Sequence, residues 1–171
     1  MRLDLGYLVV TGTSTASRAP EIVRGLHAMG LSTITLMTPN ARRVISPWEL
    51  SSLDGNRLVE SYFDAAILPR PPLGLVLVAP CGFNSLNKLA AGIADNLALS
   101  VVAEAIGRRT PVIVAPSVNA PLLSHPRTAA STVTLREWGV SVVPPEDCGE
   151  GPRLAPTDVL LAEVRRRLGD V

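Results

Sequence analysis

The sequence has almost no excess charge, because 16 basic residues face 15 acidic ones for a formal net charge of +1. A protein that holds nucleic acid by its phosphates needs a basic surface, so this balance argues against a nucleic-acid partner. Cysteine is equally scarce. Cys81 and Cys148 are too few for a disulfide framework, and their spacing is wrong for a zinc site.

Membrane-length apolar runs are also lacking, since the apolar stretches are strand-length or are interrupted by Asp95, Asn96 and Glu104. The first residues, Met1–Asp4, do not have the profile of a signal peptide. We therefore expect a cytoplasmic protein with no membrane partner. Hydrophobic residues make up 47% and charged residues 18% of the chain, which excludes intrinsic disorder. We expect one domain over residues 1–171, with much surface buried between subunits.

The apolar pattern alternates between strand and helix periods. Short apolar runs predict five strands, at Leu5–Val10, Ser32–Met37, Leu73–Ala79, Pro111–Ala115 and Val140–Val143. Three- and four-residue repeats predict helices at Ala19–Gly30, Asn84–Ile106 and Pro126–Trp138, and a last one through Leu160–Leu168 with an arginine-rich outer face. Pro80 is expected to end the third strand, and Ile45–Pro72 to be a loop with one or two helical turns. Regular alternation predicts an α/β fold, a doubly wound parallel sheet in a three-layer αβα sandwich.

Ligands of such sheets bind beyond the carboxyl ends of the strands. Four segments follow strands here: Thr11–Ser17, Thr38–Arg43, Pro80–Ser85 and Pro116–Pro126. The first is rich in small hydroxyl residues before a helix, which favours a phosphate-binding turn. A turn that only caps the helix is the alternative. The second and third glycines of the dinucleotide fingerprint are absent, so NAD is not expected.

Single residues at these ends allow two interpretations each. Asn84 is suited to hydrogen-bond a planar ring, or only to cap a helix, and Asn119 to bind a ligand, or only to form a turn. Cys148 lies in a flexible acidic loop, and most lone cysteines are inert. His27 is expected on an exposed helix face, and His125 in a turn before a helix.

Taken together, the segments resemble a known family. Pro80–Leu97, PCGFNSLNKLAAGIADNL, is similar to the signature of the homo-oligomeric flavin-containing cysteine decarboxylases. That family includes phosphopantothenoylcysteine decarboxylases and the peptidyl-cysteine decarboxylases of lantibiotic precursors. Ala115–Pro126 is similar to its substrate-binding motif, and Val10–Leu26 and Leu36–Ile45 resemble its phosphate turn and second strand end. The matching signature positions are Asn84, Lys88, Ala90, Gly92, Asp95, Asn96 and Leu97.

The resemblance implies a Rossmann-like flavoprotein fold, FMN as the cofactor, and a homo-oligomer, trimeric or dodecameric, that holds FMN and substrate at a subunit interface. It implies that Asn119 binds the substrate carboxylate and that Cys148 supplies a proton. Residues implied for the FMN phosphate are Gly12, Thr13, Ser14 and Thr38; those implied for the ring and ribityl chain are Cys81, Gly82, Phe83, Asn84 and Ser117.

The chain departs from the family in three places. Counting from Pro80 puts Ala66 where the family has an active-site histidine, with Glu60, Tyr62 and Asp64 as candidate replacements. Val118 and Leu122–Leu123 replace the large Met and Met-Trp of the substrate motif. The lid after Cys148 continues as Pro152–Ala155 instead of the usual Gly-x-Met-Ala.

The sequence therefore favours an FMN-dependent, oxidative decarboxylase of a cysteine-derived carboxylate, most simply the C-terminal cysteine of a modified peptide, released as an enethiol. A small cysteine-containing substrate such as phosphopantothenoylcysteine fits the altered pocket less well. One alternative is an FMN-binding regulatory or scaffold subunit without the histidine. Another is an FMN oxidoreductase that does not decarboxylate. A NAD-binding Rossmann domain is the least favoured interpretation, because the glycine fingerprint is incomplete.

Overall fold

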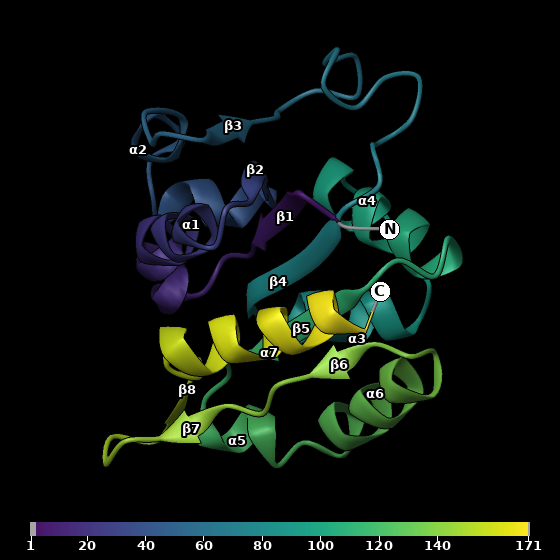
Figure 1. Cartoon of the computed structure of the whole chain (residues 1–171). Coiled ribbons are helices and arrows are strands. Elements are labelled where there is room, and N and C mark those ends of the chain that lie inside the picture. Colours follow the sequence, from purple (N-terminus) through teal and green to yellow (C-terminus); the bar gives the residue numbers. More distant parts are fainter. Residues whose placement is uncertain (1–2, 171) are drawn as a thin grey trace.

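The computed structural model describes residues 3–170 of the chain (Figure 1). Met1, Arg2 and Val171 lie outside the described residues, and with them part of the N-terminal segment discussed above and both ends of the expected 1–171 domain. The elements in chain order are β1 (Leu5–Val10), η1 (Ser14–Arg18), α1 (Ala19–Ala28), β2 (Ser32–Met37), η2 (Pro39–Arg43), α2 (Pro47–Ser51), β3 (Asn56–Leu58), β4 (Leu75–Cys81), α3 (Phe83–Ala90), α4 (Leu97–Gly107), β5 (Val112–Pro116), α5 (Ala120–Leu123), α6 (Pro126–Glu137), β6 (Ser141–Val142), β7 (Glu146–Asp147), β8 (Pro152–Arg153) and α7 (Thr157–Gly169).

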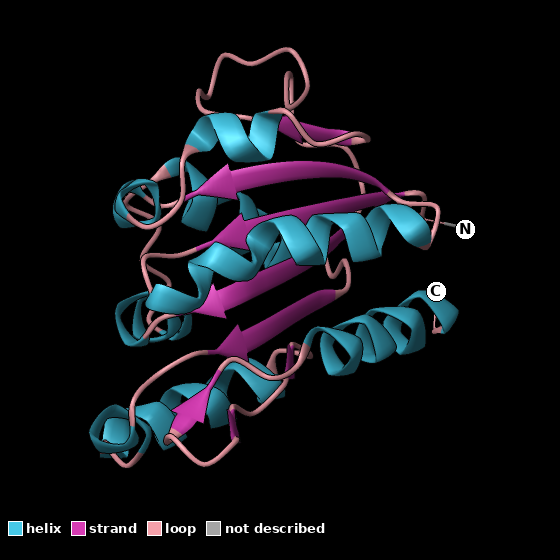
Figure 2. Ribbon diagram, turned by 90° about the vertical axis from the view of Figure 1, so that its left-hand side faces the viewer, coloured by secondary structure: helices cyan, strands magenta, loops and turns pink. Residues whose placement is uncertain are grey.

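The central sheet has six strands in the order β3-β2-β1-β4-β5-β6, and each neighbouring pair is parallel. The arrowheads of the long strands accordingly point to one side in Figure 2. The chain winds outward from β1 to β3 and then returns to β4, so the winding direction switches between β1 and β4. This is the doubly wound order of Rossmann-like folds, and it places the expected ligand crevice at the carboxyl ends of β1 and β4.

Side chains of β1 alternate between two cores. Leu8 and Val10 pack with α1 and α7 on one face of the sheet. Tyr7 and Val9 pack with α3, α4 and α6 on the other. Because both faces are covered, the strands are apolar throughout rather than alternating, which is why they read as continuous runs in the sequence. The three-layer αβα prediction is confirmed.

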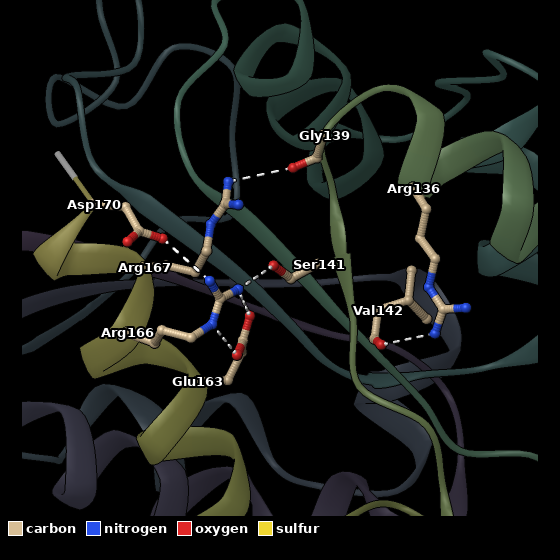
Figure 3. Close-up of polar contacts among 8 residues, drawn as sticks. All are labelled: Arg136, Gly139, Ser141, Val142, Glu163, Arg166, Arg167 and Asp170. Carbon is tan, nitrogen blue, oxygen red and sulfur yellow. Dashed lines mark hydrogen bonds and ion pairs between the residues drawn. The ribbon is translucent and has the colours of Figure 1, made fainter.

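Arginine side chains of α6 and α7 bond to the β6 edge of the sheet and to the turn before it (Figure 3). Arg166 on α7 forms an ion pair with Glu163 at 2.6 Å and reaches the Ser141 hydroxyl of β6. Its hydrogen bonds hold the pKa of Glu163 below the usual range. Arg136 of α6 donates to the Val142 carbonyl at 3.3 Å, and Arg167 donates to the Gly139 carbonyl at 3.2 Å. The arginine-rich face of the last helix therefore fixes the short strand β6 in place.

The long helix predicted over Asn84–Ile106 is wrong, because the structure has two helices there. After α3, Gly92 adopts the left-handed conformation at φ +72°, which ends the helix. Asn96 then caps α4, its Oδ1 accepting from the Leu99 N–H at 3.0 Å. Gly92 and Asn96 are both visible in the sequence as helix end and helix start. The apolar repeat nevertheless continues across them, because α3 and α4 pack against the same face of the sheet.

Two further expectations are corrected. Pro80 does not end its strand, because β4 continues to Cys81. The register shifts between Val78 and Cys81, and such an irregularity accommodates a residue without an N–H donor. In the segment expected to be a loop, α2 is the helical turn foreseen, but β3 also forms and pairs with β2. None of the helices formed by residues 3–170 is both long and apolar enough to span a membrane.

Candidate functional site

A cavity of about 840 Å³ lies at the carboxyl ends of β1, β2, β4 and β5. All four segments predicted from the strand order contribute to it, together with the α3–α4 turn and the β7–β8 hairpin. Its lining residues are Thr11–Thr15, Thr38–Asn40, Gly82–Ser85, Lys88, Asp95, Asn96, Leu99, Ser117–Ala120, Leu122 and Glu150–Arg153. Nine of the eleven site residues named from the sequence are among them, and the exceptions are the two cysteines.

The floor of the cavity is the junction between β1 and β4. The buried hydroxyl of Thr11 donates to the Pro80 carbonyl at 2.7 Å and accepts from the Gly82 N–H at 2.9 Å. The Thr11 N–H also donates to the Pro80 carbonyl, at 3.2 Å. Thr11 thus gives the Pro80 carbonyl and the Gly82 N–H a hydrogen-bond partner where β1 and β4 diverge. Backbone groups at a crevice of this kind need such partners, because the two strands no longer pair with each other there.

Gly12 lets the turn after β1 lie against the turn after β2. A Cβ at Gly12 would stand 2.5 Å from Asn40 Cβ and 2.9 Å from the Asn40 carbonyl carbon. These distances are far inside contact range and involve backbone, so no side chain fits there without moving a turn. The close approach brings Thr13, Thr38 and Asn40 to one end of the cavity.

A row of hydroxyl groups crosses the cavity from β1 to β5. The Thr13 and Thr15 oxygens lie 2.8 Å apart, and the Thr15 and Ser117 oxygens 2.7 Å apart. Each hydroxyl both donates and accepts, so the row can reorient its hydrogens to suit a polar ligand. Ser117 itself is positioned by its backbone N–H, which donates to the Cys81 carbonyl at 2.9 Å.

Three helix starts face the cavity without a side-chain cap. The N-cap residues Thr13 of η1, Thr38 of η2 and Gly82 of α3 form no capping hydrogen bond. The first N–H groups of η1 and α3 are therefore available to a ligand, and so is the Asn40 N–H in η2, where Pro39 has none. The partial positive charge of a helix start favours an anion. The suggestion that Asn84 caps α3 is wrong, because Gly82 is the N-cap and Asn84 is an exposed residue of the first turn.

Asn119 is fixed in one orientation at the end of β5. It is the N-cap of α5, and its Oδ1 accepts from the Leu122 N–H at 3.1 Å. Because the oxygen is committed to the helix, the side chain offers the cavity the two hydrogens of Nδ2. The turn and ligand interpretations of this residue therefore do not exclude each other.

A charged pair bridges the α3–α4 turn at the cavity wall. Lys88 donates to Asp95 at 2.6 Å, and this hydrogen bond lowers the pKa of the Asp95 carboxyl. Also on α3, the Phe83 ring packs edge-to-face against the His125 ring, with centroids 5.1 Å apart. His125 caps α6 through Nδ1, which confirms it as a turn residue before a helix, and His27 is exposed on α1 as expected.

The two cysteines do not line the cavity. Cys81 is expected beside the flavin ring, but its side chain is fully buried in the core with α3 and α4, and burial raises its thiol pKa to about 12. Cys148, expected as proton donor, is exposed in the turn of the β7–β8 hairpin. The Asp147 carboxylate shapes that turn by accepting from the N–H groups of Gly149 and Gly151. The turn places Glu150–Arg153 at the cavity instead.

None of the candidates for the missing histidine lines the cavity either. Ala66 packs against the α3-side core, its N–H donating to Asp64 at 2.8 Å. Asp64 forms an ion pair with Arg57, and Glu60 with Arg42. The Tyr62 hydroxyl lies 2.8 Å from the Ser100 hydroxyl. Within residues 3–170 of one chain, no imidazole or carboxylate from this segment reaches the site.

Several lining residues were not singled out from the sequence. Thr15 and Asn40 lie in segments that the strand-end rule selected, so that rule was the available signal. Lys88 and Asp95 were noted only as signature positions, because a predicted continuous helix hid the turn they bridge. Glu150 and Arg153 lie in the lid segment that the resemblance pointed out, but neither was named as a site residue, since only the folded hairpin brings them to the cavity.

The strand order, the switch-point crevice and the open N–H donors define a Rossmann-like domain built to hold a phosphate-bearing cofactor. The chain belongs to the Flavoprotein family, whose family model matches residues 6–169. This confirms the resemblance to the flavin-containing cysteine decarboxylases drawn from the motifs.

Curated relatives carry decarboxylase names. A probable phosphopantothenoylcysteine decarboxylase of Streptococcus mutans is 29% identical over 175 residues, covering 94% of this chain and 97% of the relative. Phosphopantothenoylcysteine decarboxylase of Mus musculus is 32% identical over 143 residues, covering 79% and 70%. The bifunctional coenzyme A biosynthesis protein CoaBC of Thermococcus kodakarensis is 26% identical over 167 residues, and the chain spans 41% of its length.

Solved structures show the same fold at low identity. The FMN-binding protein AtHal3 superposes with a TM-score of 0.83 at 20% identity, covering 99% of both chains. The peptidyl-cysteine decarboxylase EpiD superposes with a TM-score of 0.80 at 19% identity, covering 95% of this chain and 99% of its own. The topology predicted from the alternation of strands and helices is thereby placed among known flavoprotein folds.

Proposed function

We propose that this protein is an FMN-dependent decarboxylase of a cysteine-derived carboxylate, and that residues 1–171 form one FMN-binding domain. The substrate we propose is the C-terminal cysteine of a modified peptide, released as an enethiol after oxidative decarboxylation. The observation that carries the proposal is a single cavity in which open N–H donors at the ends of β1, β2 and β4 face the Asn119 amide at the end of β5.

The residues present fit FMN by the chemistry of their donors. Gly12 and Ser14 offer backbone N–H groups, and Thr13, Ser14 and Thr38 offer hydroxyls, all suited to a phosphate monoester. The turn is too close-packed for a side chain at position 12. Gly82, Phe83, Asn84 and Ser117 offer backbone, amide and hydroxyl groups along the rest of the cavity, where a ring and a ribityl chain need them. Cys81 is not among these residues, because its thiol is in the core and its carbonyl accepts from the Ser117 N–H.

The reaction needs an electron sink, because a simple carboxylate that loses CO₂ leaves an unstabilised carbanion. FMN bound in the cavity would accept a hydride from the thiol-bearing carbon, which gives the neighbouring carbon that sink. The task of Asn119 is then to hold the carboxylate with the two Nδ2 hydrogens. The apolar walls formed by Val118 and Leu122 desolvate the same group and favour release of neutral CO₂.

The position of Cys148 supports the oxidative outcome over the one used in coenzyme A synthesis. The reaction of coenzyme A synthesis is completed by a proton delivered to the product, and the resemblance implies that Cys148 delivers it. Cys148 is exposed and outside the cavity, whereas release of an enethiol needs no such donor. The smaller side chains of Val118 and Leu122 also favour a substrate other than phosphopantothenoylcysteine.

We further propose that the protein is a homo-oligomer, a trimer or dodecamer, whose neighbouring copies complete the site. The support is apolar surface near the segment that lacks the histidine. Phe63 is 86% exposed and Trp48 75% exposed, and Tyr62, Leu68 and Leu73 are also exposed. In Figure 1 the segment after β3 forms the loop above the sheet.

One observation favours a second candidate, an FMN-binding regulatory or scaffold subunit. Ala66 stands at the family's histidine position, and none of its three candidate replacements lines the cavity. A protein that binds FMN without turnover requires nothing more than the donors described.

Mass spectrometry of the substrate separates these functions. The FMN-loaded protein is incubated with cysteine-terminated peptides and with phosphopantothenoylcysteine. Loss of CO₂ together with two hydrogen atoms from a peptide is the expected result. Loss of two hydrogens alone would identify an oxidoreductase, and loss of CO₂ alone a non-oxidative decarboxylase. An unchanged mass for every substrate, with FMN bound, would support the scaffold subunit instead.

A further inference from the structure

Arg18 joins the cofactor side of the cavity to the segment that precedes α7. Its Nη1 donates to the Leu154 carbonyl at 3.0 Å, and its Nη2 donates to the Ala155 carbonyl at 3.0 Å and to the Thr157 hydroxyl at 2.9 Å. Both terminal nitrogens of the planar guanidinium are used at once. A lysine ammonium is a single point donor and cannot reproduce this fork.

The contact connects two rigid parts of the molecule. Arg18 ends η1 and precedes α1, between Ala16 and Ala19, which are fully buried. On the other side, Leu154 and Ala155 are buried in the same core. The hydrogen bonds of the Arg18 guanidinium therefore fix the distance and angle between η1 and the backbone at residues 154–155. Neither segment can shift without breaking these bonds.

The segment 144–153, which we call the cavity hairpin, depends on that contact. Its hydrogen bonds and ion pairs within the described chain are internal: the β7–β8 ladder, the Asp147 turn and the Glu150–Arg153 pair. The chain enters the hairpin from β6. That end is held by two hydrogen bonds, from the Val143 N–H to the Val114 carbonyl and from the Arg136 side chain to the Val142 carbonyl (Figure 3). The chain leaves the hairpin at Leu154, fixed by Arg18.

The hairpin supplies Glu150–Arg153 to the cavity, while η1 supplies Ser14 and Thr15 to another part of its lining. We propose that Arg18 is a positioning residue that sets how the cavity hairpin lies over the substrate side of the site. Arg18 itself is not among the lining residues and acts through the hairpin. The substrate consequence rests on the proposed decarboxylase function, but the placement of the hairpin does not.

The test compares four variants with the wild-type protein. Arg18→Lys keeps the charge and removes the fork, and Arg18→Met removes both. Thr157→Val removes one acceptor and leaves the two carbonyl bonds, so it covers the case in which Arg18→Met does not fold. Arg57→Lys is the matched control, because Arg57 forms an exposed ion pair at the opposite sheet edge. The readouts are hydrogen exchange of the hairpin amides, FMN titration, and KM and kcat for a cysteine-terminated peptide.

We expect Arg18→Lys and Arg18→Met to speed exchange at the Gly149 and Gly151 amides about tenfold or more, and Thr157→Val to do so by less. FMN affinity and kcat stay within about twofold of wild type while KM rises about tenfold, because the phosphate turn is unchanged and the hairpin is displaced. Arg57→Lys matches wild type in every readout.

Wild-type exchange in both Arg18 variants overturns the inference, whatever the activity. Faster exchange with an unchanged KM also overturns it, because the hairpin would then move without affecting the substrate. A wild-type protein that turns over no peptide refutes the proposed function, and the exchange rates alone then decide whether Arg18 places the hairpin.

Discussion

The Thr11 hydroxyl accepts a 2.9 Å hydrogen bond from the Gly82 N–H, and through it the end of β1 is tied to the start of α3. The two residues are 71 positions apart in the chain and meet where the sheet changes its winding direction. The same hydroxyl donates to the Pro80 carbonyl, so one side chain bonds both residues that flank Cys81.

Replacing Thr11 by Val tests that tie with a side chain of the same shape. The half-buried Gly82 N–H loses its acceptor, so we expect the free energy of unfolding to fall by about 1 kcal/mol. Chemical denaturation measures the loss. Thr11→Ser keeps the hydroxyl and should retain most of the stability, and an equal loss in both variants would show that packing of the methyl group matters instead.

Gly12→Ala should weaken FMN binding at least about tenfold, because the added Cβ would lie 2.5 Å from Asn40 Cβ and must push the two phosphate-side turns apart. Fluorescence titration with FMN measures the affinity. The matched control is Gly107→Ala at the end of α4, where a Cβ meets nothing within 4 Å. Tight FMN binding by Gly12→Ala would mean that the phosphate lies elsewhere.

Asn119→Asp separates capping from substrate binding. Aspartate also caps helices, so α5 and the protein's stability should be kept. The new carboxylate replaces the Nδ2 donors and repels the substrate carboxylate, so kcat/KM should fall about a hundredfold or more while FMN binding stays intact. Steady-state kinetics and thermal unfolding measure the two effects. Full activity in this variant would remove Asn119 from the site.

The two thiols should differ in reactivity. Burial raises the pKa of Cys81 from 9.0 to about 12, whereas Cys148 is exposed. In the folded protein an alkylating reagent should therefore modify one cysteine, and none in Cys148→Ser, as counted by intact-mass spectrometry. Two rapidly modified cysteines in the native protein would contradict the buried placement.

The same raised pKa has a consequence for stability against pH. The folded state favours the protonated Cys81 thiol, so its contribution is fully present below pH 9, the ordinary thiol value, and is lost as the pH rises toward about 12. Unfolding free energies measured between these values should fall less steeply in Cys81→Ala than in wild type. Equal slopes would show that Cys81 does not contribute in this range.

The strands and their ends were the predictable part of this protein. Leu5–Val10 and Ser32–Met37 form strands with those bounds, because strands covered on both faces are apolar without interruption. The parallel order then brings their ends together, which is why nine predicted residues line one cavity. By contrast β3, Asn56–Leu58, has no apolar run, and its strand conformation comes from pairing with β2.

Side-chain direction was not predictable. Cys81 belongs to a motif that lines the cavity, yet the alternation of β4 turns its thiol into the core. Cys148 and Arg153 lie five residues apart on one hairpin, and only Arg153 reaches the cavity. The hydrogen bonds of Arg18 could not be predicted for the same reason, since their acceptors lie 136 or more residues away in the chain.

Calorimetric titration of the flavin-free protein with FMN decides whether the cavity is a flavin site. We expect saturable binding of one FMN per chain, abolished or much weakened by Gly12→Ala and unchanged by Gly107→Ala. Absence of any heat of binding in the wild-type protein, with no flavin already present in its visible spectrum, would contradict this expectation.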